Sequence, residues 1–289
     1  MKMAVLQNKI DFKAFLVVEN ANCNGDPLNG NMPRTTYDGY GEMSDVCLKR
    51  KIRNRLLDMG ENIFVQSDDK KTDDFHSLKA RAEANPEFGA ELKNKKKADT
   101  EKAYQAACKE WMDVRAFGQV FAFKNEELSL GVRGPVTIQP AFSVDPVDVT
   151  SIQITKSVNS EDKVGKASDT MGMKHRVDFG VYELKGSINV QLAEKNGFTE
   201  EDAEKIKEAI RTLFVNDASS ARPEGSMTVH KLYWWKHNCK IGQYSSKKVH
   251  DSVEICKKDE KNTSPKSMDD YEIIVHHLEG LEPEEYEGL

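Results

Sequence analysis

The sequence contains no apolar run long enough to cross a bilayer, and its N-terminus has no signal-peptide pattern. Its five cysteines are widely spaced and form no CxxC pair, which argues against a zinc site and a disulfide framework. The adjacent His276 and His277 face opposite ways on a strand, so they are poor joint metal ligands. We therefore expect a cytoplasmic protein with no membrane partner, no metal and no other cofactor.

Net positive charge is also lacking, because the chain carries a formal charge of −6. The acids are unevenly distributed, however: residues 269–289 hold eight of them and no lysine or arginine. Removing this segment's charge of −8 leaves residues 1–268 at +2, so the overall charge does not exclude nucleic acid. The acidic C-terminal segment either solubilises the chain or contacts a basic neighbour.

The most distinctive stretch is a polar loop that joins a predicted strand, residues 12–19, to a short basic helix. Gly and Asn are frequent in residues 20–34; these residue types bring backbone N–H groups close to a ligand and tolerate left-handed conformations. The predicted helix is capped by Ser44 or Asp45 and ends near Gly60. Leu48, Ile52 and Leu56 form its apolar stripe, and the cations lying off that stripe are Lys49, Arg50 and Arg53.

Each of these two features alone has a plainer explanation. A polar loop after a strand is usually only a connection, and a basic helix face is usually only solvated. Side by side, a loop that accommodates anions and a cationic helix favour a surface that holds the phosphates of a nucleic acid.

The remaining segments alternate between helical and strand-like patterns. Residues 60–112 are rich in charge and poor in β-branched residues, so they predict a helical insertion with little apolar content of its own. Tyr233, Trp234 and Trp235 either stack on bases or belong to the core. The predicted strands are 114–123, 130–138 (with an edge or bulge at Gly134-Pro135), 149–155, 179–192, 227–236 and finally 271–277, and the clearest predicted helix is 199–214, capped by Thr199.

This order predicts an α+β fold over residues 1–289: one antiparallel sheet with two packed helices, the ferredoxin-like or RRM arrangement. The usual aromatic RNA-binding motif of that fold is absent, so binding has to use loops and the basic helix.

Residues 156–178 interrupt the pattern and are too long for an ordinary connection between strands. They are either a loose surface loop or part of a projecting hairpin, residues 150–180. In the hairpin, flexible methionines would wedge between bases and cations would contact phosphates. The residues concerned are Lys156, Met171, Met173, Lys174, His175 and Arg176.

Four short motifs together resemble the backbone subunit of CRISPR Cascade complexes, most closely the type I-C form, within the repeat-associated RNA-binding superfamily. Their order and spacing carry the resemblance, which covers residues 12 to about 236. The motifs are NGDPLNGNMPR at 24–34, DVRAFG at 113–118, RGPV at 133–136 and TMGMKH at 170–175.

The resemblance implies a modified RRM palm, a helical insertion and a thumb hairpin. Such subunits polymerise along a CRISPR RNA as a helical filament and support its pairing with target DNA. Other Cascade subunits cap the ends, and a nuclease-helicase is recruited later. Carried over by motif, the RNA-binding residues are Asn24, Asn29, Arg34, Lys49, Arg50 and Arg53, the six residues named for the hairpin, and Arg222.

The resemblance also raises an enzymatic alternative, since related type III subunits cut target RNA with a loop aspartate and a metal. Asp26, Asp45 and Asp113 are the candidates. None has a histidine or second carboxylate at metal-ligand spacing. We therefore expect a non-catalytic subunit, with a metal-dependent ribonuclease as the alternative.

Overall fold

The computed structural model describes residues 4–94, 98–124, 126–155 and 171–289. The helices are α1 (Asp45–Asp58), α2 (Leu78–Ala84), α3 (Pro86–Lys93), α4 (Thr100–Glu110), α5 (Met112–Phe117), α6 (Val190–Asn196), α7 (Glu200–Arg211) and α8 (Ser246–His250), with 3-10 turns η1 (Pro27–Asn29) and η2 (Met268–Asp270). The strands are β1 (Ile10–Ala21), β2 (Gly25–Asp26), β3 (Met32–Pro33), β4 (Tyr40–Met43), β5 (Gly118–Ala122), β6 (Ser129–Arg133), β7 (Val136–Ile138), β8 (Ala141–Pro146), β9 (Val149–Thr155), β10 (Met171–Ile188), β11 (Met227–Lys236), β12 (Val253–Lys257), β13 (Tyr271–Val275) and β14 (Glu284–Glu287).

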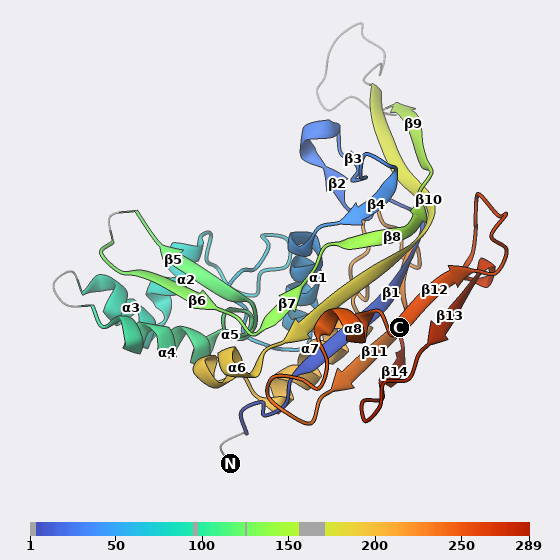
Figure 1. The fold of residues 1–289 in the computed structure, drawn as a ribbon. Helices are drawn as coiled ribbons and strands as arrows, with labels where there is room; N and C mark the ends of the chain where they lie inside the picture. The colour runs from blue at the N-terminus through green and yellow to red at the C-terminus, as the bar shows by residue number, and fades with distance from the viewer. Residues whose placement is uncertain (1–3, 95–97, 125, 156–170) are drawn as a thin grey trace, which may run out of the picture.

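An eight-stranded antiparallel sheet forms the centre of the molecule, in the order β14-β11-β1-β10-β8-β4 with β7 and β9 also paired to β10 (Figure 1). The strands β11, β1, β10 and β7, with α1 and α7 between them in sequence, are compatible with a ferredoxin-like or RRM sheet. The predicted α+β fold built on an antiparallel sheet is confirmed.

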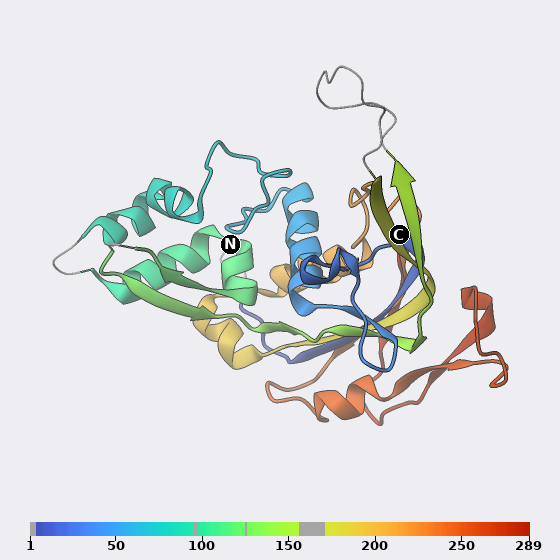
Figure 2. The ribbon, with the colours of Figure 1, turned by 90° about the horizontal axis from the view of Figure 1, so that it is seen from above.

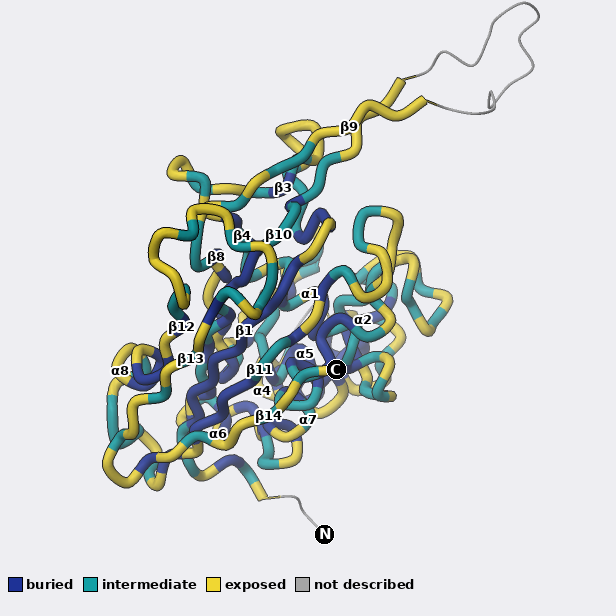
Figure 3. Tube along the Cα trace, turned by 90° about the vertical axis from the view of Figure 1, so that its right-hand side faces the viewer, coloured by how far each residue is buried: buried dark blue, intermediate teal, exposed yellow. Residues whose placement is uncertain are grey.

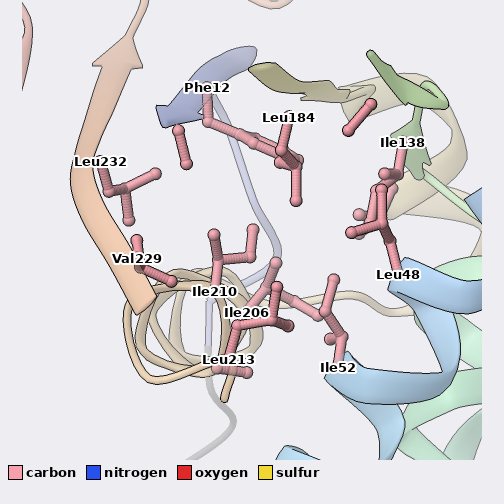
Figure 4. Close-up of a cluster of buried hydrophobic side chains, with 14 of the residues drawn as sticks. Phe12, Leu48, Ile52, Ile138, Leu184, Ile206, Ile210, Leu213, Val229 and Leu232 are labelled. Atoms are coloured by element: carbon pink, nitrogen blue, oxygen red, sulfur yellow. The ribbon is translucent and has the colours of Figure 1, made fainter. Parts of the chain in front are cut away.

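One face of the sheet packs on α1 and α7. Leu48 and Ile52 of α1 and Ile206 and Ile210 of α7 point toward the apolar side chains of β1, β10 and β11 (Figure 4). Both helices follow the predicted pattern. Thr199 caps α7 in a full capping box with Asp202, which satisfies two backbone N–H groups at the start of the helix.

The opposite face is covered by a C-terminal lobe, residues 237–281, which contains α8, β12 and β13. Sequence reasoning missed α8 and β12. Tyr233 and Trp235 are buried under this lobe, and Trp234 stacks on Phe12 on the other face. These aromatics are therefore core residues, and the base-stacking alternative is wrong.

A cluster of buried polar side chains lies beneath the same lobe. Asp11 accepts from His237 at 2.9 Å and from Lys9 at 2.9 Å. Lys13 pairs with Glu183 at 2.6 Å, and its ammonium also donates to backbone carbonyls of the lobe. Because unpaired buried charge is costly, these contacts tie the lobe to β1 in one arrangement.

Residues 60–112 form helices that pack around an aromatic cluster of their own, together with the β5–β6 hairpin (Figure 1). Phe64, Phe88, Trp111 and Phe121 contact one another in it, with ring centroids 4.7 to 6.2 Å apart. The apolar residues of the insertion are therefore supplemented by those of β5 and β6, which complete this core.

Two strand predictions in this region need correction. The first half of 114–123 is helix α5, and only Gly118 onward is strand. The strand expected over 130–138 is split at Gly134 into β6 and β7, which belong to different sheets. Gly134 sits where a Cβ atom would lie 2.2 Å from the carbonyl oxygen of Ala116, so only glycine lets the chain turn against α5.

The arm, defined as β9 with Met171–Val177 of β10, projects from one end of the sheet (Figure 3). The strand 149–155 is confirmed. The strand expected over 179–192 begins earlier, at Met171. It ends at Ile188, because the next residue, Asn189, caps α6.

The acidic C-terminal segment contains β14, which pairs with the edge of β11. The strand over 271–277 is thus not the last one. Lys207 lies 3.2 Å from Glu284, and Lys231 lies 3.3 Å from Glu285, so this acidic strand contacts basic residues of its own chain. In the part of the chain that the structure describes, no helix has the length and apolar character needed to span a membrane.

Candidate nucleic-acid interface

A groove of about 290 Å³ runs beside α1, between the first loop and residues 216–222. Three separate parts of the chain supply its cations: Arg50 and Lys51 from α1, Lys70 from the insertion, and Arg222 from the loop before β11. α1 lies between the insertion and the arm (Figure 2). Two carboxylates, Asp69 and Asp217, also line the groove.

The predicted loop residue Asn24 positions α1. Its Oδ1 accepts from the backbone N–H and hydroxyl of Ser44 at 2.9 and 3.0 Å, and Ser44 in turn caps the helix. The loop thus holds the N-terminus of α1 against the groove. Asn24 itself lines the groove, although its side-chain oxygen is already occupied.

The cations of α1 have different roles. Arg50 is exposed and, among the described residues, forms no ion pair. Lys49 pairs with Asp45 at 3.0 Å. Lys51 is almost fully buried, pairs with Asp217 and lies 5.5 Å from the Phe214 ring centroid. Of these, Arg50 is the cation that the helix offers to a ligand.

Arg53 is directed toward the insertion. Its Nε donates to Asp113 at 3.0 Å, and its guanidinium stacks over Phe117 at 5.1 Å. Asp113 is fully buried and also accepts from the backbone N–H groups of Phe64 and Val65 at 2.7 and 3.1 Å. This pair joins α1 to the insertion core.

Arg222 is fixed at the opposite wall of the groove. Its Nε donates to Asp217 at 3.2 Å, and its backbone N–H and carbonyl both bond to Ser219. In the described chain its two terminal NH₂ groups have no partner, so they remain available to phosphate oxygens. Lys70 instead donates to the carbonyl of Asn216.

The other two predicted residues of the first loop lie beyond the groove. Arg34 pairs with Asp26 at 3.3 Å, with about a third of its side chain exposed. Asn29 is exposed at the end of the turn η1, next to Leu28. Neither residue lines the groove, and both are placed at the surface.

The arm presents different side chains on its two faces, because opposite residues of an antiparallel pair share a face. Met171, Met173 and His175 lie on one face, and His175 bonds to Ser151 at 2.7 Å. Lys174 and Arg176 lie on the other face, with Ile152 and Ile154. The methionines are 64% and 54% exposed, so neither is part of the core. Lys156 lies outside the described residues.

The three candidate aspartates are already engaged. Asp26 caps η1 and pairs with Arg34, Asp45 pairs with Lys49, and Asp113 is buried in the Arg53 pair. Within the described ranges no three His, Cys, Asp or Glu side chains gather as metal ligands. The exposed Arg50 and the terminal amines of Arg222 are suited to holding phosphate.

The profile of the family described as "CRISPR-associated protein Cas7" matches residues 8–276. The chain belongs to the Cas7 family. The match covers the whole sheet except β14, together with the insertion, the arm and the groove residues.

A CRISPR-associated protein Cas7 from Haloferax volcanii is 25% identical over 206 residues, which are 65% of this chain and 58% of that protein. The chain therefore matches little more than half the length of this curated relative. Two solved structures are similar in shape. A chain of a "CRISPR RNA-guided surveillance complex, pre-nicking" has a TM-score of 0.49 at 17% identity over 78% of both chains. A chain of a "CRISPR RNA-guided surveillance complex" has a TM-score of 0.40 at 18% identity over 78% of this chain and 68% of its own. Both scores are low, so the family assignment rests on the sequence profile.

Seen as a Cas7-family groove, the site contains residues that sequence reasoning overlooked: Lys70, Asp69 and Asp217. Asp217 is distant in sequence from the basic helix, and Asp69 and Lys70 lie in the segment after it, outside any helical pattern that would connect them with its cations. The one sequence feature that pointed to this part of the groove was the loop NDASSARPEGS, which contains Asp217 and places Arg222 among turn-forming residues.

Proposed function

We propose that this Cas7-family chain is a CRISPR RNA-binding backbone subunit of a type I-C Cascade complex. The observation that carries the proposal is the groove beside α1, where Arg50 and the terminal amines of Arg222 face the same space without ion-pair partners of their own in the described chain. Such a groove grips sugar-phosphate and ignores bases, as a protein that accepts any guide sequence must.

The division of the chain fits this role. The palm is the antiparallel sheet with α1 and α7, residues 60–112 belong to a helical insertion, and residues 150–180 are the thumb hairpin. The acidic segment 269–289 closes one sheet edge. Copies assemble head to tail along the RNA, because heterologous contacts produce an open filament.

The guide is then free to pair with target DNA, as in other RNA-guided systems. Other Cascade subunits cap the filament, and the nuclease-helicase is recruited to the finished complex. The chain acts in the cytoplasm.

The RNA contacts divide into two groups. Arg50 and Arg222 hold phosphates directly, with Asn24, Asn29, Arg34 and Lys49 around them. The arm contributes Met171, Met173, Lys174, His175 and Arg176, with Lys156 beyond β9. For Arg53 we propose a supporting role, since its Nε is bonded to Asp113 and its guanidinium stacks on Phe117.

The experiment that tests this function replaces Arg50 and Arg222 together by Ala and measures binding of a labelled single-stranded RNA across a salt series. Affinity falls as salt rises, and each lost phosphate contact makes the plot of log affinity against log salt less steep by about 1. The matched control removes two cations from the C-terminal lobe, Lys240→Ala with Lys247→Ala. Equal RNA binding by the groove variant and the wild-type chain would contradict the proposal.

The chain acts without catalysis in this proposal. The ribonuclease alternative is decided by incubating the RNA-bound protein with complementary RNA and Mg²⁺. Regularly spaced cuts that disappear in Asp26→Ala would establish it, and intact RNA supports the non-catalytic role.

A further inference from the structure

Asp217 is a carboxylate placed in a groove that otherwise collects cations. Its side chain is only 15% exposed, and its Oδ2 contacts both the Lys51 ammonium and Nε of Arg222. Simple electrostatics makes this residue a disadvantage, since a negative charge in the groove repels phosphate.

The geometry of the contact gives the carboxylate another use. Asp217 binds Arg222 at Nε, at 3.2 Å, and leaves both terminal NH₂ groups unbound. Arg53 is held by Asp113 through Nε in the same way, whereas Arg115 gives Nε and one Nη to Asp202 and its other Nη to the carbonyl of Cys108. Asp217 therefore holds Arg222 at Nε, and the two terminal NH₂ groups of the guanidinium point away from this carboxylate.

The support behind this contact is rigid. Asp217 is itself fixed by the buried Lys51, whose ammonium lies against the Phe214 ring. The backbone of the loop is tied to the residue that follows β1, by a bond from Asn22 N–H to the carbonyl of Ala221 at 2.9 Å. Both the main chain and Nε of Arg222 are thus anchored, which lowers the entropy lost when a phosphate binds its fork.

We propose that Asp217 is a positioning residue for the RNA backbone: it aims the Arg222 guanidinium into the groove, and this gain outweighs its repulsion of phosphate. The inference rests on the proposed function. Electrostatic repulsion alone predicts that removing the negative charge of Asp217 strengthens RNA binding. The positioning role predicts that the same change weakens it.

The test compares two variants with the same change in charge, Asp217→Asn and Asp69→Asn, in the full chain with a labelled single-stranded RNA of guide length. Asp69 lines the same groove and has no ion-pair partner among the described residues. We expect Asp217→Asn to bind about tenfold more weakly, equivalent to about 1.4 kcal/mol. Its plot of log affinity against log salt should be less steep by about 1, because the phosphate contact of Arg222 is lost. Asp69→Asn should bind more tightly than the wild-type chain, because it removes a groove charge that repels phosphate.

A second variant keeps the test decisive if Asp217→Asn fails to fold, as judged by its thermal unfolding curve. Arg222→Lys preserves the charge and the Lys51–Asp217 pair but removes the fork, so it should lose the same factor in affinity. Unchanged or tighter binding by a folded Asp217→Asn, or by Arg222→Lys where the first variant is unfolded, would overturn the positioning role. A wild-type chain that does not bind RNA would instead refute the proposed function.

Discussion

Individual side chains in this protein show that a charge near the groove is not automatically a ligand for it. Lys51 and Arg53 stand two positions apart on the basic helix, yet one is buried against Asp217 and the other against Asp113. Their partners lie 166 and 60 residues away in sequence. Only the tertiary structure separates these supporting residues from Arg50.

His250, on the face of the C-terminal lobe that contacts β10, makes stability depend on pH. Burial lowers the pKa of His250, whose Nε2 contacts the carbonyl of Gly186 at 3.0 Å. A histidine that is neutral in the folded state contributes stability that is complete above its unfolded pKa of about 6.5 and is lost as pH falls toward the folded value. We expect the free energy of unfolding to decrease as pH falls from 7 to 5.

The measurement is urea unfolding at both pH values, with His250→Gln as the comparison. The glutamine retains a donor for the Gly186 carbonyl but does not titrate, so its decrease should be smaller. The exposed His276→Gln is the control and should behave like the wild-type chain. An equal decrease in the His250 variant would contradict the assignment.

At the scale of elements, the sequence predicts most reliably those whose signals are local. The capping box and apolar stripe of α7 and the β-branched residues of β9 needed nothing from the rest of the chain. The segment 114–123 was misjudged because it alternates like a strand. Residues 112–117 are helical because Asp113 and Arg115 each reach a distant partner, in α1 and α7.

The arm is an element whose role lies outside the core, so its apolar residues can be changed without unfolding the protein. We expect Met171→Ser with Met173→Ser to leave the thermal unfolding temperature unchanged, since both side chains are more than half exposed. If the methionines act on the guide, assemblies on RNA should become irregular or short in electron micrographs.

The opposite face of the arm provides the matched control, Ile152→Ser with Ile154→Ser. A difference between the two double variants would assign separate tasks to the two faces. Regular, full-length assemblies from the methionine variant would remove this role from the proposal.

For the molecule as a whole, the proposed function predicts how mass grows with RNA length. Because each copy occupies a fixed length of strand, doubling the guide should about double the number of copies bound. Mass photometry of full chains on guides of two lengths measures this. The groove variant of Arg50 and Arg222 is the control, and a single copy on either guide would favour an isolated RNA-binding module.

The short strand β14 has a consequence for such crowding. Many copies on one RNA would bring their sheets close together. At such a local concentration, an unpaired β11 edge could form backbone hydrogen bonds with the same edge of a neighbouring copy. Glu284, Glu285 and Glu287 occupy that border within each chain, where they pair with Lys207 and Lys231. In such an array, the acidic terminus would cover the β11 edge of every copy and limit edge-to-edge pairing between their sheets.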